Sequence, residues 1–336
     1  MQYRNLGKSN LKVSALCLGT MMFADQTAHD EAATIVADAR AHGVNYIDTA
    51  DNYSKGGSET MVGELLQGQR HDWVLATKMG NAMSDRVNEG HYSRSWMLRE
   101  VTASLARLRT DYVDILYLHR DFAGMNLEEP LRALDAMLRA GQIRAWGVSN
   151  FRGWRIAALV RLAAQLGMPG PVVCQPYYNL LNRMPEVEVL PACAHYGIGV
   201  TPYSPVARGV LTGKYLPGQP PAPDSRVGRG DARIAQTEFR EESLLIAQQL
   251  KVHAENKGIS LAQFACSWVL ANPVVSSVIA GPRTLKQWQD YLPALDYALT
   301  QEDETLVDSL VHPGHPSTPG YTDPVYPPLG RVRLAP

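Results

Sequence analysis

The hydrophobic positions of the chain form short apolar runs that alternate with longer segments of helical periodicity. The runs predict eight strands, at residues 14–19, 44–48, 73–78, 113–118, 143–148, 172–176, 198–203 and 275–280. Most of these runs are continuous rather than alternating, which is typical of parallel strands that are buried on both faces. The pattern therefore predicts a parallel sheet with helices on its outer side.

A helical segment follows almost every predicted strand. The periodicity predicts helices at 28–42, 58–68, 93–109, 127–140, 152–166, 185–196, 260–271 and 284–295. Ser58 is expected to cap the second of these helices, and Gly197 is one of several glycines placed where a helix should end. Strand followed by helix, repeated eight times, predicts an α/β fold of the (β/α)8 TIM-barrel type over residues 1–336 as one domain.

The alternative architecture is a doubly wound sheet, which usually carries a G-x-G-x-x-G motif after its first strand. The residues after the first predicted strand read GTMMFADQ, and the motif occurs nowhere in the chain, so the barrel is favoured. Three additions to the barrel are expected. They are an N-terminal hairpin in the first ten or so residues, a loop and helix inserted at 206–258 after the seventh strand, and an irregular, Pro- and Gly-rich tail at 311–336.

Composition excludes several classes of function. Of the 336 residues, 45% are hydrophobic and 19% are charged, and the formal net charge is −1, so bulk charge recruits neither nucleic acid nor an anionic membrane. The four cysteines are scattered without a C-x-x-C pair, which argues against a disulfide framework or a metal site. No signal peptide or membrane-spanning run is visible. We therefore expect a cytoplasmic protein without metal, membrane or nucleic-acid partners.

In an α/β barrel the working groups lie at the carboxyl ends of the strands. Asp48 ends the second predicted strand and Tyr53 follows in its loop, while Lys78 and His119 end the third and fourth strands. Each of these residues alone has an ordinary structural interpretation. Together they favour one chemistry, because an ammonium lowers the pKa of a neighbouring phenol, a carboxylate holds the ammonium, and an imidazole orients a substrate oxygen. The group is suited to protonating an alkoxide that forms during hydride transfer.

Six segments of the chain carry a family pattern in order and spacing: YRNLGKSNLKVSALCLGTM, YIDTADNYSKGGSE, LATKMG, DYVDILYLHR, WGVSNF and YSPVARGVLTGKY. This set resembles the aldo-keto reductase superfamily, in a bacterial-type form related to the channel β-subunit-like branch. The resemblance implies a catalytic tetrad of Asp48, Tyr53, Lys78 and His119, with Tyr53 as the general acid. It also implies NADPH-dependent reduction of small aldehydes or ketones to alcohols.

The resemblance further implies how the cofactor would lie across the barrel mouth. Ser149, Asn150 and Gln175 correspond to residues that bind the nicotinamide carboxamide, and Tyr203 corresponds to the aromatic residue that stacks on its ring. Arg283 offers a cation to a 2′-phosphate, so NADPH is expected rather than NADH. The other expected contacts with the cofactor are Gly19, Thr20, Met21, Asp48, Ser204, Pro205, Val206, Ala207, Arg208, Lys214, Arg226, Gly281, Thr284, Gln287 and Asp290.

The substrate pocket is expected at the same rim. Its predicted walls are Met22, Phe23, Tyr53, His119 and Phe122, together with Tyr321 and Tyr326 of the tail. An aromatic mouth suits small apolar carbonyls, while Arg120 leaves a phosphorylated or sugar-derived aldehyde open. The chain reads His-Arg-Asp-Phe after the fourth strand, where many relatives read His-x-Pro-Asp. It has Tyr291 where an adenine-contacting Asn is common, so that contact is not expected.

Two other functions remain as alternatives. One is a cofactor-binding regulatory or sensor subunit with slow or no turnover, as in the channel-associated relatives; the intact tetrad argues against it. The other is a barrel enzyme of another class, such as a lyase or a metal-dependent hydrolase. That class needs a His and carboxylate cluster at the strand ends, where His119 stands alone. The sequence leaves open whether the protein is a monomer or a homo-oligomer.

Overall fold

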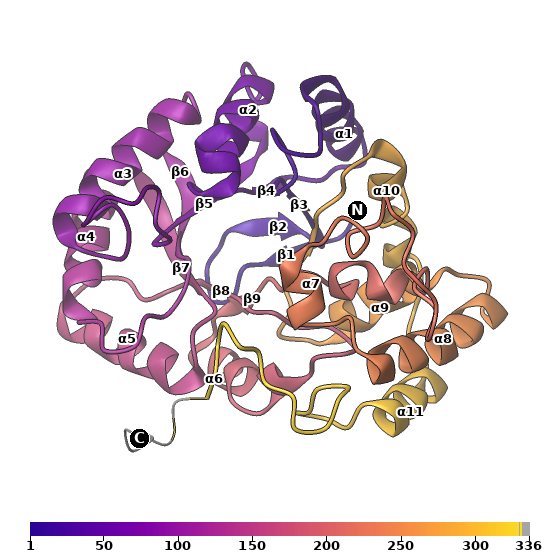
Figure 1. Ribbon diagram of the computed structural model, residues 1–336. Coiled ribbons are helices and arrows are strands. Elements are labelled where there is room, and N and C mark those ends of the chain that lie inside the picture. Colours follow the sequence, from indigo (N-terminus) through magenta and orange to yellow (C-terminus); the bar gives the residue numbers. More distant parts are fainter. Residues whose placement is uncertain (329, 331–336) are drawn as a thin grey trace.

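In a computed structural model, which describes residues 1–328 and 330, eight parallel strands form the central sheet (Figure 1). Their order is β10-β3-β4-β5-β6-β7-β8-β9. Backbone hydrogen bonds from Val200 to Val274 (3.1 Å) and from Ser276 to Val200 (2.8 Å) join β9 to the segment that leads into β10. Ile279 of β10 donates to the carbonyl of Pro202 at 3.0 Å, which closes the barrel. The strands are β3 (Leu16–Gly19), β4 (Tyr46–Asp48), β5 (Val74–Met79), β6 (Val113–Leu118), β7 (Ile143–Ser149), β8 (Val173–Gln175), β9 (Gly199–Val200) and β10 (Val278–Ala280).

Helices surround this barrel on the outside, which confirms the predicted (β/α)8 fold (Figure 1). They are α1 (His29–Ala41), α2 (Gly57–Leu65), α3 (Arg94–Arg107), α4 (Glu128–Arg139), α5 (Gly153–Gln165), α6 (Val189–Tyr196), α9 (Leu261–Ala271) and α10 (Leu285–Gln289).

Three details of the predicted helices are wrong. The helix expected at 185–196 is a 3-10 helix at Met184–Glu186 followed by α6, which begins only at Val189. The helix expected at 284–295 ends early, at Gln289, and a short 3-10 helix at Leu292–Leu295 with Pro293 in its first turn follows it. Ser58 does not cap α2, because that helix begins one residue before it. Its hydroxyl instead donates a hydrogen bond to the carbonyl of Thr20 at 2.8 Å.

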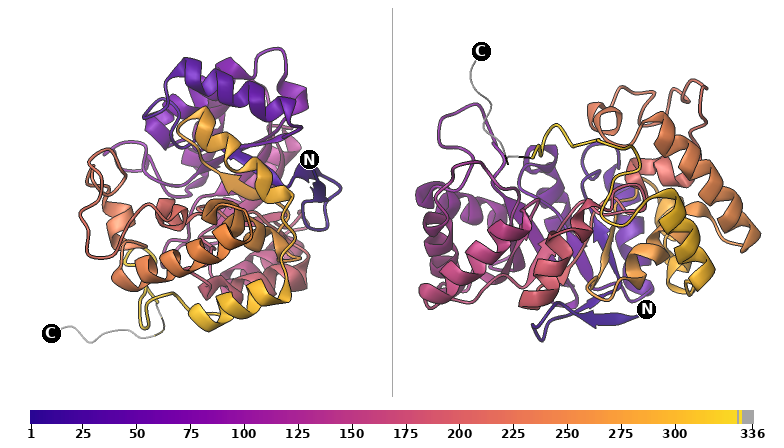
Figure 2. Two further views of the ribbon diagram at one scale, coloured as in Figure 1. Left: turned by 90° about the vertical axis from the view of Figure 1, so that its right-hand side faces the viewer. Right: turned by 90° about the horizontal axis from the view of Figure 1, so that it is seen from below.

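The expected N-terminal hairpin consists of β1 (Tyr3–Asn5) and β2 (Lys12–Ser14), paired antiparallel. It covers the end of the barrel opposite the inserted segment (Figure 2). Gly7, in its turn, has a φ of +58°, and a Cβ there would lie 2.4 Å from the backbone nitrogen of Gly199. Leu6 is fully buried and belongs to the apolar cluster inside the barrel. The hairpin is therefore a fitted floor, and ligands reach the interior from the other end.

The insertion after β9 contains a 3-10 helix at Ala207–Thr212 and the helices α7 (Ala232–Gln236) and α8 (Glu241–Asn256). The long helix α8 was expected and the short helix α7 was not. The helix α11 (Gln301–Leu310) was also not predicted. It buries few side chains, and a capping box of Thr300 and Asp303 begins it.

The tail after α11 runs over the barrel without a helix as far as residue 328. Both terminal nitrogens of Arg233 in α7 donate to Asp323, at 3.0 and 2.7 Å. Arg152, just before α5, donates to the carbonyl of Tyr326 at 2.7 Å. These contacts tie the tail to both sides of the barrel mouth. Residues 329 and 331–336 of the predicted irregular tail lie outside the described residues.

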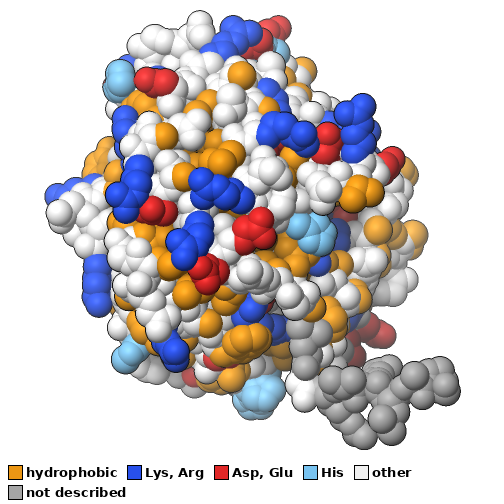
Figure 3. Space-filling model, turned by 90° about the vertical axis from the view of Figure 1, so that its left-hand side faces the viewer, with side chains coloured by type: hydrophobic (Ala, Val, Ile, Leu, Met, Phe, Trp, Pro, Cys, Tyr) orange, Lys and Arg blue, Asp and Glu red, His pale blue; other side chains and the backbone are white. Residues whose placement is uncertain are grey.

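The outer face over α3, α4 and α5 carries intermingled basic and acidic side chains (Figure 3). Several of them pair along a helix, as Arg132 does with Glu128 at 2.6 Å and Arg139 with Asp135 at 2.8 Å. This face is therefore neither uniformly basic nor uniformly acidic. In the part of the chain that the structure describes, the helices are also too short or too polar to span a bilayer.

Candidate active site and cofactor cleft

Lys78 is fully buried near the end of β5 and connects two other predicted catalytic residues, Asp48 and Tyr53, by hydrogen bonds. Its Nζ donates to a carboxylate oxygen of Asp48 at 2.6 Å, to the carbonyl of Thr49 at 2.7 Å and to the hydroxyl of Tyr53 at 3.2 Å. Gln175 of β8 donates to the other oxygen of Asp48 at 2.9 Å. The ammonium therefore uses its three donors on three fixed acceptors, and one of them is the phenol.

The electrostatics of this group differ in one respect from the expectation. Burial alone would lower the pKa of Lys78, but Asp48 and Tyr53 raise it overall, so the ammonium stays charged. Burial raises the pKa of Tyr53 above its usual value and outweighs the opposing effect of Lys78. The expected net lowering of the Tyr53 pKa is therefore not found. At neutral pH Tyr53 holds a proton, as a general acid must.

His119 follows β6 and lies beside Tyr53. The two ring centroids are 6.0 Å apart with an edge-to-face angle of 79°. Burial lowers the pKa of His119 well below its usual value, and the charges of Lys78 and Arg120 lower it further. The Nδ1 atom of the imidazole lies 3.0 Å from the amide nitrogen of Asn81. His119 is thus a neutral imidazole with one ring nitrogen already engaged.

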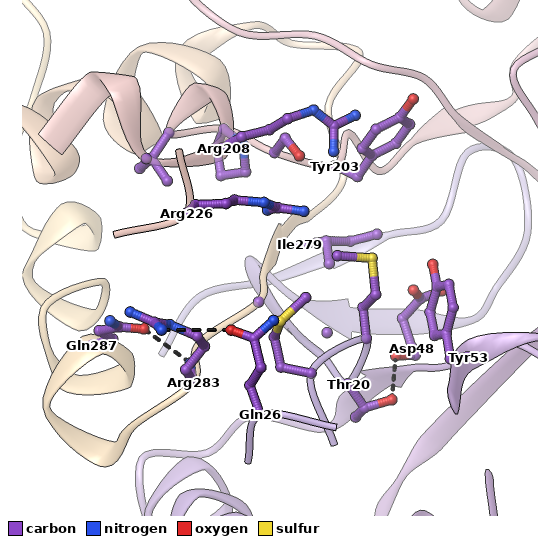
Figure 4. A pocket seen from close by; sticks show the side chains of 18 of the residues that line it. Thr20, Gln26, Asp48, Tyr53, Tyr203, Arg208, Arg226, Ile279, Arg283 and Gln287 are labelled. Atoms are coloured by element: carbon purple, nitrogen blue, oxygen red, sulfur yellow. Dashed lines mark hydrogen bonds between the residues drawn. The ribbon is translucent and has the colours of Figure 1, made fainter. Parts of the chain in front are cut away.

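Three of the four predicted catalytic residues, Asp48, Tyr53 and His119, line one end of a cavity of about 360 Å³, which extends to Arg283 and Gln287 (Figure 4). Most of the expected cofactor and substrate residues line it: Gly19, Thr20, Met21, Met22, Asp48, Tyr53, His119, Ser149, Asn150, Gln175, Tyr203, Ser204, Pro205, Val206, Arg208, Lys214, Arg226, Gly281, Arg283, Gln287 and Asp290. Residues 250 or more positions apart in sequence are thereby brought to one wall. Lys78 lies behind this wall and acts through Asp48 and Tyr53.

Five expected contacts are not part of the wall: Tyr321, which is described below, and the four residues that follow. Ala207 is fully buried beneath its loop, and Phe23 is fully buried in the core. The Thr284 hydroxyl accepts a hydrogen bond from the backbone of Gln287 at 3.3 Å and so caps α10. Phe122 stacks on His91 at a centroid distance of 4.1 Å. Ala207, Phe23 and Thr284 each lie next to a cavity residue in sequence, and Phe122 lies three residues after His119, but each of the four points another way.

Beside the catalytic residues, the cavity wall is held rigid by hydrogen bonds. Asn150, with a φ of +60°, donates to the hydroxyl of Ser149 and to the carbonyl of His119, both at 3.0 Å. The Tyr203 hydroxyl donates to the carbonyl oxygen of the Asn150 side chain at 2.8 Å. The Tyr203 ring stacks on Tyr177, with centroids 5.3 Å apart. A fixed aromatic plane next to amide groups suits a flat ring that carries a carboxamide.

Cations gather at the other end of the cavity: Arg208, Lys214, Arg226, Arg229 and Arg283. Partial burial, followed by the charges of Arg283 and Arg229, lowers the pKa of Lys214. The buried Nε of Arg208 has no hydrogen-bond partner among the described residues. The backbone is left-handed at Ser204, before the 3-10 helix, and at Ala207 and Arg208, the first two residues of that helix, with φ between +47° and +56°. Crowded cations with an unused donor fit a ligand that carries phosphate groups.

The wall also contains residues that the sequence analysis did not assign to it: Gln26, Asn52, Asn81, Gly209, Thr212, Arg229, Ala262, Ile279 and Tyr291. Tyr291 lines the cavity although no contact was expected there. Of the two tail tyrosines, Tyr326 lines the cavity, whereas the Tyr321 hydroxyl donates to the backbone of Gln236 at 3.0 Å. The side-chain amides among them, Gln26, Asn52 and Asn81, lie in loops that follow strands. This position is the one feature of the sequence from which they could have been predicted. No group of three potential metal ligands occurs in residues 1–328 and 330.

Comparisons with known proteins give a family match and several similar proteins. A family model described as the aldo/keto reductase family matches residues 15–312. A probable voltage-gated potassium channel subunit beta of Arabidopsis thaliana is 39% identical over 302 residues, which cover 88% of this chain and 92% of that protein. The uncharacterized oxidoreductase YrpG of Bacillus subtilis (strain 168) is 34% identical over 313 residues, which cover 90% of this chain and 93% of that protein.

Proposed function

The chain belongs to the aldo/keto reductase family, and from this premise we propose that it reduces aldehydes or ketones to alcohols with NADPH. One observation carries the proposal. A charged, fully buried Lys78 connects Asp48 to the hydroxyl of Tyr53, and Tyr53 and His119 line the same cavity as the cluster of cations. The cavity can therefore hold a phosphate-bearing cofactor with its reactive end beside a proton donor.

Each catalytic side chain has one task in this reaction. When bound, the reduced nicotinamide supplies the hydride to the carbonyl carbon. Tyr53 gives its hydroxyl proton to the carbonyl oxygen, and Lys78 stabilises the phenolate that remains. Asp48 keeps Lys78 charged and in place, with its second oxygen held by Gln175. His119 donates a hydrogen bond to the carbonyl oxygen and so fixes its position between the two rings.

The preference for NADPH over NADH rests on the cationic end of the cavity. Arg283 lies in the loop between β10 and α10. Among the described residues, its guanidinium donates one long hydrogen bond, to the side chain of Gln26 at 3.5 Å (Figure 4). A 2′-phosphate would offer it a charge-assisted partner. We expect Arg283→Gln to weaken NADPH binding about tenfold or more, since a hydrogen bond to a charged group contributes roughly 1.5–3 kcal/mol. NADH binding should change little. Fluorescence titration with both cofactors measures the two affinities.

The reaction is tested by following NADPH oxidation with a panel of aldehydes and ketones. Tyr53→Phe removes the proton and little else, so turnover should fall by roughly 100-fold or more, the range of general-acid catalysis. The affinity for NADPH should stay near that of the wild type. Equal rates for the two proteins would contradict the assignment of Tyr53.

A second candidate function comes from the names of the relatives. Proteins of Arabidopsis thaliana and of rice (Oryza sativa subsp. japonica) that are similar to this chain are described as probable voltage-gated potassium channel beta subunits. A regulatory subunit that binds the cofactor would bind NADPH without turnover across the panel. The complete hydrogen-bonded group around Lys78 favours the enzyme. We further propose a cytoplasmic protein with a small-molecule carbonyl substrate and without nucleic-acid or membrane partners.

A further inference from the structure

Asn81 lies in the loop after β5, lines the catalytic end of the cavity and faces the imidazole of His119. Its amide nitrogen is 3.0 Å from Nδ1 of His119. We infer that Asn81 is a positioning residue that holds His119 as the tautomer protonated on Nε2, so that the imidazole donates a hydrogen bond to the substrate oxygen. The inference rests on the proposed carbonyl reduction, since it concerns how the substrate of that reaction is oriented.

The chemistry of the two side chains leads to this assignment. An amide nitrogen can only donate a hydrogen bond, so Nδ1 facing it accepts that bond and carries no proton. A neutral imidazole has one N–H, which must then be on Nε2. Burial opposes a second proton on the ring, and the charges of Lys78 and Arg120 oppose it further. His119 is therefore a donor because of its tautomer and not because it is charged.

The backbone and neighbours of His119 leave Asn81 as the group that selects the tautomer. The backbone nitrogen of His119 donates to the carbonyl of Met79 at 2.9 Å, and its own carbonyl accepts from Asn150 at 3.0 Å. These bonds fix where the ring is attached but do not contact its nitrogens. Among the described residues, Asn81 provides the hydrogen bond to the ring.

Two substitutions separate the tautomer from mere support of the ring. In Asn81→Asp a carboxylate replaces the amide, and since it only accepts hydrogen bonds it favours the proton on Nδ1. Nε2 then cannot donate at about pH 8, and kcat/KM should fall on the order of 100-fold, as for the loss of one positioned donor. The same carboxylate raises the pKa of His119 from its lowered value, so as the pH falls the imidazole gains a second proton, Nε2 donates again and the loss should diminish. Asn81→Ala leaves both tautomers accessible and should cost less, with no such recovery at low pH.

The tautomer can be read directly in the full-length protein labelled with 15N-histidine. NMR shifts distinguish protonated from unprotonated ring nitrogens, and the signals of His119 are identified by their loss in His119→Gln. The wild type should show a protonated Nε2 and an unprotonated Nδ1, with and without NADP+. Asn81→Asp should show the reverse. Ser84→Ala, which changes the same loop at a hydroxyl bonded to Glu89, should leave both the spectrum and the kinetics unchanged.

Two outcomes would overturn the inference: a wild-type His119 with its proton on Nδ1, or an Asn81→Asp variant whose activity is lost equally at every pH. The first is measured without turnover, so it stands even if no carbonyl is reduced. Failure of the wild type to reduce any carbonyl would count against the proposed function, while the NMR result would still decide the tautomer.

Discussion

Glu238 lies between α7 and α8, within the insertion, and its side chain is buried. We expect its protonation to make the free energy of unfolding depend on pH. Its side chain is 1% exposed, and Oε2 has no hydrogen-bond partner among the described residues. The Nε atom of Arg208 lies 3.8 Å away. Burial raises the pKa of Glu238 from 4.5 to about 8, with Arg240 lowering it and Asp323 raising it further. We therefore expect Glu238→Gln, a neutral replacement of the same shape, to be more stable than the wild type above the acidic range.

The sign follows from where the proton resides. Between pH 4.5 and about 8 the folded protein keeps a proton on Glu238 that the unfolded chain releases. Unfolding is therefore favoured as the pH rises through this window, by roughly 1.4 kcal/mol per pH unit for one group. Across the whole window the wild type should lose on the order of 4–5 kcal/mol relative to Glu238→Gln. Below the window the two proteins should differ little, and above it the difference should be constant.

Urea unfolding followed by tryptophan fluorescence, at several values between about pH 5 and about pH 8, measures the difference in free energy of unfolding. Glu255→Gln is the matched control, because Glu255 lies in the same insertion, on α8, with its side chain 57% exposed. Its difference from the wild type should not depend on pH. If the difference for Glu238→Gln is also independent of pH, Glu238 is not a protonated group in the folded protein and the reasoning is refuted.

Three other substitutions, the first with a control, test the N-terminal hairpin, the buried Lys78 and the C-terminal tail. Gly7→Ala should destabilise by more than about 2 kcal/mol in thermal unfolding, because the new methyl group meets backbone. Gly68→Ala, with a similar φ but open space around it, should cost only about 1 kcal/mol. Lys78→Met should abolish turnover and cost about 3 kcal/mol by leaving Asp48 buried without its cation; unchanged stability would contradict the ion pair. Asp323→Asn should loosen the tail and raise the KM for carbonyl substrates several-fold, with NADPH affinity kept.

The elements that the sequence predicted well are those whose burial leaves a clear apolar pattern in their own residues. A run such as residues 113–118 is apolar throughout because both of its faces are covered, and that pattern survives without knowledge of its neighbours. The prediction of the catalytic residues rests on the same apolar runs. Asp48, Lys78 and His119 directly end buried strands, and barrel topology brings such positions to one rim.

The features that were missed depend on direction and on partners distant in sequence. Phe23 and Phe122 follow strand ends, but nothing in the sequence shows that one turns into the core and the other onto His91. Asn81 follows Lys78 by three residues and has no distinguishing pattern, since its role comes from His119, 38 residues away. The helix α11 was missed because its sequence, QEDETLVDSL, is mostly polar and only Asp303 and Val307 are buried.

The proposed function assigns its two parts to different strands of the barrel. Tyr53 and His119 follow β4 and β6, whereas Arg208 and Arg283 follow β9 and β10. The two groups line the same cavity from these different strands. Under the proposed function this layout is modular for protein engineering: a library confined to the loops after β9 and β10 can select for a different dinucleotide while Tyr53 and His119 stay unchanged.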